Sequence, residues 1–194
     1  MNPHQQLQQF LLPIHALKSE EMEAFLAVWE PYTCKRKQVL TQSGETERYL
    51  YFVLEGVQRC YCLTPAGAEA TIVFTYPYSF SGVADSFLTQ TPSGYVLETL
   101  TASSFLRTSY TQLEQLLHHY PNIQTLLLKA TAFVLKGVLE RQVELQYYSA
   151  EDKFRTLLRR SPHVLNLIPH KYLASYLGID PATFSKLLGS VRIG

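Results

Sequence analysis

The sequence predicts an α+β protein, because strand-like and helix-like patterns occupy separate segments of its 194 residues. Short β-branched and aromatic runs, divided by turn residues, fill the segment from Tyr32 to about Thr108. The longest helical pattern in the chain then begins at Pro121, and two short amphipathic segments close the chain. We therefore expect a β-structure of the sandwich, barrel or jelly-roll kind, followed by a long helix and a small helical domain.

The composition is that of a globular protein, with 46% hydrophobic, 12% aromatic and 17% charged residues. No uninterrupted apolar run approaches the ~18 residues that a membrane span needs. The first residues, MNPHQQLQQFLLPIH, lack the basic start of a secretory signal. Three cysteines, Cys34, Cys60 and Cys62, are too few for a disulfide framework. We therefore expect a cytoplasmic protein with no membrane partner.

The charge of the chain is unevenly distributed. The whole chain carries +1, but the segment from Arg155 to Gly194 holds six Lys and Arg residues against one acid, Asp180. That segment is therefore +5, and the rest of the chain is −4. A basic end on a mildly acidic body is expected of a nucleic-acid-binding domain. A chance asymmetry of a solvated surface would look the same, so charge alone leaves DNA binding open.

The elements before the long helix are predicted from local patterns. LKSEEMEAFLAVWE predicts a helix that Ser19 caps and Pro31 ends, with Met22, Phe25 and Trp29 on its apolar stripe. The predicted strands are the runs YTCKRKQVL, RYLYFVLEG, VQRCYCLT, ATIVFTY and GYVLETLTA.

The long helical pattern, PNIQTLLLKATAFVLKGVLERQVELQYYS, contains one glycine and no internal proline. A helix of about 25 residues spans roughly 38 Å, which is longer than a small domain needs internally. A 4-3-4-3 spacing typical of a two-helix seam runs through Leu128, Ala132, Leu135, Leu139 and Gln142. We favour a dimerisation helix with this seam, and the alternative is a long helix that lies along the β domain.

The segment YLASYLGIDPATFSKLL predicts two helices joined by a short turn. Gly178 can adopt a positive φ and end the first helix, while Asp180 is a strong N-cap and Pro181 suits the first helical position. Phe184, Leu187 and Leu188 are expected to face inward. This geometry can place a second helix in the major groove of DNA. A helical hairpin that only packs on a core remains the alternative.

With its parts in this order, the chain resembles the cyclic-AMP receptor protein/fumarate-nitrate regulator (Crp/Fnr) family of bacterial transcription factors over roughly residues 10–192. VLTQSGETERYLYFVLEGVQR is similar to the first half of the family's cyclic-nucleotide-binding roll. SFLTQTPS and IPHKYLASYLGIDPATFSKL resemble the branch common in Bacteroidetes. The resemblance implies a sensing β-roll (a double-stranded β-helix jelly roll) at residues 1–120, a helix at 121–149 that forms a homodimer, and a helix-turn-helix domain at 150–194 that binds palindromic double-stranded DNA.

The expected effector pocket departs from the cyclic-AMP binders of that family. Val83 stands where they have a Glu for the ribose, and Ser93-Gly94-Tyr95 stands where they have an Arg for the cyclic phosphate. No Lys or Arg lies between Ala66 and Arg107. Since charge-assisted pairing supplies much of the affinity for a phosphate, we expect no tight cyclic-nucleotide binding. The effector, if any, is unknown, and an apolar or neutral molecule suits the candidate pocket residues, which by resemblance are Phe80, Ser81, Gly82, Val83, Ser93, Gly94 and Tyr95.

The sequence contains few residues that could bind another cofactor or carry out enzymatic chemistry. Three cysteines do not supply the four that an iron–sulfur cluster needs. No histidine lies between residues 16 and 117, which disfavours a haem sensor and a metal-dependent enzyme on a jelly roll. We expect a protein without catalytic residues, metal or cofactor.

The second helix of the C-terminal pair also departs from the family. Ala182 stands where the family has a base-reading Glu, and Lys186, which lacks the bidentate fork, stands where it has an Arg. We expect the DNA contacts at Lys171, Thr183, Ser185, Lys186 and Arg192. Two functions follow: a dimeric DNA-binding regulator, which we favour, and a degenerate sensor or interaction protein without sequence-specific DNA binding.

Overall fold

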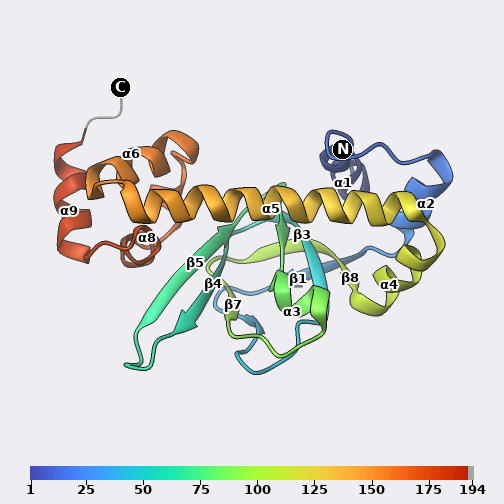
Figure 1. The fold of residues 1–194 in the computed structure, drawn as a ribbon, viewed down its shortest axis with the longest axis horizontal. Coiled ribbons are helices and arrows are strands. Elements are labelled where there is room, and N and C mark those ends of the chain that lie inside the picture. The colour runs from blue at the N-terminus through green and yellow to red at the C-terminus, as the bar shows by residue number, and fades with distance from the viewer. Residues whose placement is uncertain (192–194) are drawn as a thin grey trace. The chain divides into compact units, whose positions relative to one another are not determined.

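The structure, a computed structural model, describes residues 1–191. The chain divides into two compact units, which are described separately below (Figure 1). Unit 1 consists of residues 1–60 and 74–133, and unit 2 consists of residues 61–73 and those from 134 onward. The mixed composition of strands and helices agrees with the α+β expectation.

Two four-stranded sheets form from eight strands within the described residues, with orders β1-β8-β3-β6 and β2-β7-β4-β5. The strands are β1 (Glu30–Cys34), β2 (Val39–Thr41), β3 (Tyr49–Glu55), β4 (Gln58–Leu63), β5 (Glu69–Thr75), β6 (Phe80–Ser81), β7 (Val96–Thr99) and β8 (Ser103–Ser109). The helices of unit 1 are α1 (Pro3–Leu11), α2 (Ser19–Ala27), α3 (Ala84–Thr89), α4 (Tyr110–His119) and the first part of α5 (Pro121–Tyr147).

The ends of the predicted N-terminal helix are placed differently in the structure. Ser19 is the first residue of α2 and not its cap, because the backbone N–H of Lys18 is instead bonded to the Glu21 carboxylate at 2.8 Å. The helix ends at Ala27, and Pro31 lies inside β1. β1 is an edge strand of its sheet, where a residue without a backbone N–H is tolerated.

Strand β8 is antiparallel to both of its neighbours, with Tyr32 opposite Phe105 and Tyr51 opposite Arg107. Because side chains alternate along a strand, Phe105 and Leu106 point to opposite faces of this sheet. The first face looks into the roll, where its side chains pack with residues of the second sheet. That buried cluster consists of Cys34, Tyr51, Val53, Cys60, Val83, Leu97 and Phe105.

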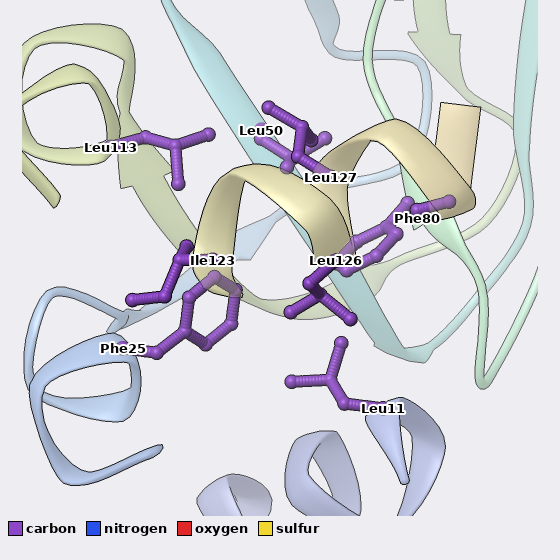
Figure 2. A pocket seen from close by; sticks show the side chains of 9 residues that line it. Leu11, Phe25, Leu50, Phe80, Leu113, Ile123, Leu126 and Leu127 are labelled. Atoms are coloured by element: carbon purple, nitrogen blue, oxygen red, sulfur yellow. The ribbon is translucent and has the colours of Figure 1, made fainter. Parts of the chain in front are cut away.

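The opposite face of the same sheet is covered by helices. Phe52 and Leu106 pack there against α1, α2, α4 and the start of α5. Figure 2 shows Leu11, Phe25 and Ile123 among the side chains that converge from these elements. The crevice between them has a volume of about 10 Å³, which is about one water molecule. The helical core of unit 1 is therefore closely packed.

Unit 2 is helical apart from the end of the β4–β5 hairpin. It contains the second part of α5, α6 (Ala150–Arg160), α7 (Val164–Leu167), α8 (His170–Leu177) and α9 (Pro181–Ser190). Phe154 of α6 and Phe184 of α9 pack edge to face, with ring centres 5.3 Å apart. Leu173 and Leu177 of α8 are also fully buried. Helices α6, α8 and α9 thus share one small core.

Helix α5 is the one helix of residues 1–191 that is long and apolar enough to cross a membrane, by length and composition alone. This differs from the sequence expectation, because Lys129 and Lys136 divide the apolar residues of α5 into runs that are each too short to span a membrane. Within the apolar window, 11% of the residues are buried in the chain. A single such helix is weak evidence for a membrane span, because helices of proteins that do not enter a membrane pass the same test of length and composition.

We predict that Phe52→Ala destabilises unit 1 by about 3–5 kcal/mol, because Phe52 is fully buried and its removal leaves a cavity. Fluorescence of Trp29, the single tryptophan and a member of the same core, reports the unfolding of this unit in urea. Leu63→Ala, at an exposed position, is the control and should leave the midpoint nearly unchanged. An equal effect of the two substitutions would contradict the assigned core.

Candidate functional site

The roll interior is lined by aromatic side chains from the first sheet. The ring centres of Tyr51 and Phe105 lie 5.3 Å apart, and Tyr32 lies within 6.4 Å of both. Burial raises the pKa of Tyr51, and the carboxylate of Glu47 raises it further. The interior is therefore apolar with phenol groups, which suits uncharged molecules better than ions.

Arg107 is a cation on this face that the sequence analysis did not consider as a site residue. Its guanidinium lies 4.0 Å from the ring centre of Tyr32 and 4.4 Å from that of Tyr49. It also forms an ion pair with Glu30 at 2.8 Å. The signal was present in the sequence, because Arg107 follows Phe105 by two residues and so shares its face. Stacked and paired in this way, Arg107 is already neutralised within the chain.

A second unpredicted group is Glu47, whose side chain is buried although it is a carboxylate. Glu47 as a whole is 1% exposed. One carboxylate oxygen accepts from the Thr41 hydroxyl at 2.6 Å and from the Val83 N–H at 3.2 Å. The other accepts from the N–H groups of Arg48 and Tyr49 at 3.1 and 3.2 Å. Burial raises the pKa of Glu47 above its ordinary value, and these hydrogen bonds limit that rise.

The predicted effector residues are mostly occupied by contacts within the chain. Ser81, Val83 and Ser93 are buried. The hydroxyl of Ser93 donates to the Tyr95 carbonyl at 2.8 Å and accepts from the Tyr95 N–H at 2.9 Å. The hydroxyl of Ser81 accepts from that of Thr75 at 2.9 Å. These hydroxyl groups already have hydrogen-bond partners within the chain, so they line the roll and are not free donors for a ligand.

The remaining predicted pocket residues lie in different surroundings. Phe80 is directed away from the roll interior, since its ring packs against Phe10 and Trp29 in the helical core. Gly82 has φ +140°, and a Cβ there would lie 3.3 Å from the carbonyl oxygen of Tyr49. Tyr95 packs against the roll cluster, and Gly94 is exposed.

A cavity of about 330 Å³ lies beside Glu47, and none of the predicted pocket residues lines it. Its lining residues are Leu40, Thr41, Glu45, Thr46, Glu47, Arg48 and Tyr49. Its residues run from β2 to the start of β3, whereas the family resemblance pointed to the segment around α3, so this cavity was not predicted. Within residues 1–191, no group of three or more His, Cys, Asp and Glu side chains is arranged to hold a metal ion.

The turn between α8 and α9 has the local conformation that the sequence predicts. Gly178 follows α8 with φ +64°, in the left-handed region. Asp180 caps α9, since its carboxylate accepts from the Thr183 N–H at 2.9 Å. Hydrogen bonds from Thr183 lower the pKa of Asp180 below its ordinary value. Pro181 is the first residue of α9, so the start of this helix is defined by its own sequence.

The predicted DNA-contact residues of α9 do not all share one face. Ser185 and Lys186 are exposed, beside Ala182. Thr183 is half-buried, and its hydroxyl is bonded to Asp180 at 2.5 Å. Leu188 lies one turn after the buried Phe184, on the same face of α9, and is 38% exposed, so this face is only partly covered at Leu188. Lys171 lies exposed on α8, with its ammonium 4.7 Å from the ring centre of Tyr172, and Arg192 lies outside the described residues.

A buried ionic cluster joins three helices of unit 2. Arg141 of α5 pairs with Glu144 at 2.8 Å, stacks on Tyr176 of α8 at 4.2 Å and donates to its carbonyl oxygen. Glu144 also pairs with Arg160 of α6. This cluster was not predicted, although two charges three residues apart in an apolar helix, Arg141 and Glu144, were a signal for it. The basic charge of +5 is also partly compensated, because Arg155 pairs with Glu151, and Glu144 and Glu151 fall outside the segment that was counted.

The predicted dimerisation residues lie on an exposed stripe of α5. Leu128 is 70% exposed, and Ala132, Leu135 and Leu139 are exposed as well. Within unit 1, Leu128 also lines a shallow groove of about 260 Å³ with apolar side chains of α3 and α4. The lining residues of this groove are Leu88, Leu117, Gln124, Leu127, Leu128 and Thr131.

Comparison with known proteins places the roll in a recognised domain class. Residues 32–120 match the sequence model of the cyclic nucleotide-binding domain family. A search of curated proteins found no match. Among solved structures, the chain is similar to FixK2 from Bradyrhizobium japonicum, with 18% identity and a TM-score of 0.74 over 84% of this chain and 83% of that chain.

Two further solved structures show the same likeness. The catabolite activator protein of Thermus thermophilus has 20% identity and a TM-score of 0.58, over 94% of this chain and 90% of that chain. A structure from Eubacterium rectale described as a transcriptional regulator of the Crp/Fnr family has 13% identity and a TM-score of 0.70, over 89% of this chain and 82% of that chain. The fold is therefore a β-roll of the cyclic nucleotide-binding kind together with a long helix, and its structural neighbours include Crp/Fnr regulators.

We predict that Glu144→Ala destabilises unit 2 by about 3–5 kcal/mol, because it leaves the buried guanidinium of Arg141 without its counter-charge. Hydrogen exchange of the α8 and α9 amides should accelerate accordingly. The matched control is Glu140→Ala, one turn away in the same helix, whose exposed pair with Lys136 at 3.8 Å contributes less than about 1 kcal/mol. Equal protection in both variants would show that the cluster does not stabilise unit 2.

Proposed function

We propose that the protein is a DNA-binding transcriptional regulator of the Crp/Fnr type. It works as a homodimer in the cytoplasm, without enzymatic activity, and its β-roll senses a small molecule other than cyclic AMP. The domain limits we propose are residues 1–120 for the roll, 121–149 for the dimerisation helix and 150–194 for the DNA-binding domain, and we place the chain in a branch of the family common in Bacteroidetes. The α8–turn–α9 geometry carries the proposal: α9 starts at a fixed cap and turns Ala182, Ser185 and Lys186 to solvent.

The exposed face of α9 suits entry into a DNA groove. Ala182, Ser185 and Gly189 are small, so the helix backbone can approach the base edges closely, and Lys186 supplies a cation that can contact guanine. We assign a phosphate contact to Lys171 of α8, because its side chain is a cation exposed to solvent. Arg159 at the end of α6 is an additional exposed cation. Affinity would then depend mainly on phosphate contacts, and sequence selectivity on a few side chains.

The homodimer is supported by the two faces of α5. Ile123 and Leu126 face the helical core of unit 1, and Arg141 and Glu144 are buried in unit 2. The opposite face carries an exposed apolar stripe that contains no charged residue, formed by Leu128, Ala132, Leu135, Val138, Leu139 and Val143. A stripe of this length along one side of a helix is typical of a seam with a second helix. A membrane span would instead be apolar all round, whereas α5 buries Arg141 and Glu144 on its other side.

The alternative is a degenerate sensor or interaction protein that does not read a specific DNA sequence. Two observations favour it: Ala182 cannot hydrogen-bond a base, and the hydroxyl of Thr183 is bonded to Asp180. The hydroxyl of Ser185 also donates within α9, to the Pro181 carbonyl at 2.9 Å, so direct readout on the described part of α9 would depend mainly on Lys186. The two functions differ in sequence selectivity, which is measurable.

For the dimer, we predict that Leu135→Glu converts the protein to a monomer, because the new charge would be buried in the seam. Analytical ultracentrifugation gives the mass of the species in solution. Lys136→Glu introduces the same side chain at the neighbouring position, on the flank of the stripe, and should leave the dimer intact. A wild-type protein that is monomeric at all concentrations would refute the homodimer.

For DNA binding, we predict that the purified protein enriches palindromic fragments from genomic DNA at moderate salt. Lys186→Ala should weaken binding to the enriched site and lower the slope of log affinity against log salt by about one. Thr183→Ala, which removes a hydroxyl already used for capping, should change affinity less than Lys186→Ala. Binding that is blind to sequence and lost at moderate salt, with and without added cell extract, would support the degenerate alternative instead.

A further inference from the structure

The carboxylate of Glu47 brings together donors from three separate segments of the roll. Thr41 ends β2, the N–H groups of Arg48 and Tyr49 lead into β3, and the N–H of Val83 precedes α3. The backbone N–H of Glu47 is in turn bonded to the hydroxyl of Ser86 in α3 at 2.9 Å. One side chain thus connects β2, β3 and α3.

The hydrogen-bonding capacity of this carboxylate is fully used. A carboxylate has about four acceptor positions, and Glu47 accepts four hydrogen bonds from neutral donors. A protein that binds a free anion surrounds it with hydrogen-bond donors in the same way. Here the anion is the Glu47 side chain itself. Glu47 has no lone pair left for a ligand, and its donors have no capacity left for a second acid.

The backbone around Glu47 is shaped to this contact. Gly82 has φ +140°, and a Cβ at this position would lie 3.9 Å from the Glu47 Oε2 and 3.3 Å from the Tyr49 carbonyl oxygen. A side chain there would be strained by the backbone conformation and crowded by that carbonyl. The glycine therefore lets the chain before Val83 adopt this conformation and pass close to the Tyr49 carbonyl, next to the carboxylate.

We propose that Glu47 is a built-in anion, which holds the donors that the acidic group of a ligand would otherwise engage. The effector of the roll must then lack an acidic group: it is an uncharged or cationic molecule that enters the cavity beside Glu47. The statement about the effector rests on the proposed sensing role of the roll. The occupation of the donors by Glu47 does not depend on that role.

The charges around the cavity agree with this ligand class. Glu45 and Glu47 line it together with Arg48, and Arg48 is exposed to solvent. Arg107, on the inner face of the roll, is paired with Glu30. A phosphate or carboxylate placed beside Glu47 would therefore meet a buried like charge, and the residues that line the cavity include no buried cation to compensate for it.

The test removes the built-in anion and offers a free one. In Glu47→Ala, the four donors lose their acceptor, so the thermal midpoint should fall in chloride buffer at mildly alkaline pH. Sodium acetate at the same ionic strength should restore part of that loss in a saturable manner, because acetate supplies the missing carboxylate. Wild type and Glu45→Ala, which changes an exposed carboxylate of the same cavity, should not respond to acetate. Should Glu47→Ala not fold in chloride, its refolding yield in acetate against chloride gives the same readout.

Glu47→Gln separates this explanation from loss of packing alone. The glutamine keeps the volume but turns an NH2 toward N–H donors, so this variant should be destabilised and should not be rescued by acetate. Isothermal titration of wild type with inorganic phosphate and with cyclic AMP should give no heat of binding.

Three results would overturn the proposal: Glu47→Ala as stable as wild type, no greater response to acetate than wild type, or binding of phosphate by wild type. All measurements use the protein without DNA. A failure of the proposed DNA binding would therefore leave the result on Glu47 unaffected.

Discussion

The alternation of side chains along β8 is the constraint on which the two cores of unit 1 depend. Because β8 lies between β1 and β3, it is fixed on both edges and cannot shift its register without breaking both ladders. Phe105 then faces the roll and Leu106 the helices, and a shift of one residue would exchange them. The same strand therefore contributes to the aromatic interior of the roll and to the surface on which α1, α2 and α5 pack.

Two buried carboxylates stabilise the fold in different ways. Glu47 is satisfied by neutral donors and connects strands to α3, whereas Glu144 is satisfied by two guanidinium groups and connects α5 to α6. A charge removed from water is costly unless all its partners are present, so each carboxylate specifies a single arrangement of the segments that reach it. In each unit, the loss of this carboxylate would therefore loosen several elements together.

The surfaces left exposed correspond to the two contacts that the proposed function needs. The apolar stripe of α5 is exposed along the described chain, and the outward face of α9 carries small side chains and the cation Lys186. Between the helices of unit 2 and the hairpin, the hydroxyl of Ser175 accepts from the Thr71 N–H at 2.9 Å and donates to the carbonyl of Glu69 at 3.2 Å. The hairpin end is thereby attached to α8, the helix that precedes α9.

The sequence by itself determined the elements whose stabilising contacts are local. The cap at Asp180, the positive φ at Gly178 and the start of α5 at Pro121 follow from residues within one turn of each feature. Strands β3, β4, β5 and β7 and the apolar stripe of α5 follow from periodicity, which needs no knowledge of the partner surface. The run predicted at residues 32–40 is divided into β1 and β2, and β6 and β8 lie outside the predicted runs. Val83 and Ala182 were likewise recognised from the sequence alone, because they differ in residue type from what the resembled family has at these positions.

Only the tertiary structure decided which polar groups are buried and with what. Glu47 meets Val83 across 36 residues and Arg141 meets Tyr176 across 35, and no local pattern states such pairings. The same long-range contacts placed the ring of Phe80 in the helical core, left Leu188 exposed and opened a cavity beside the predicted pocket. The physical reason is that burial and charge pairing depend on surfaces brought together by the whole chain, whereas caps and periodicities depend on neighbours along it.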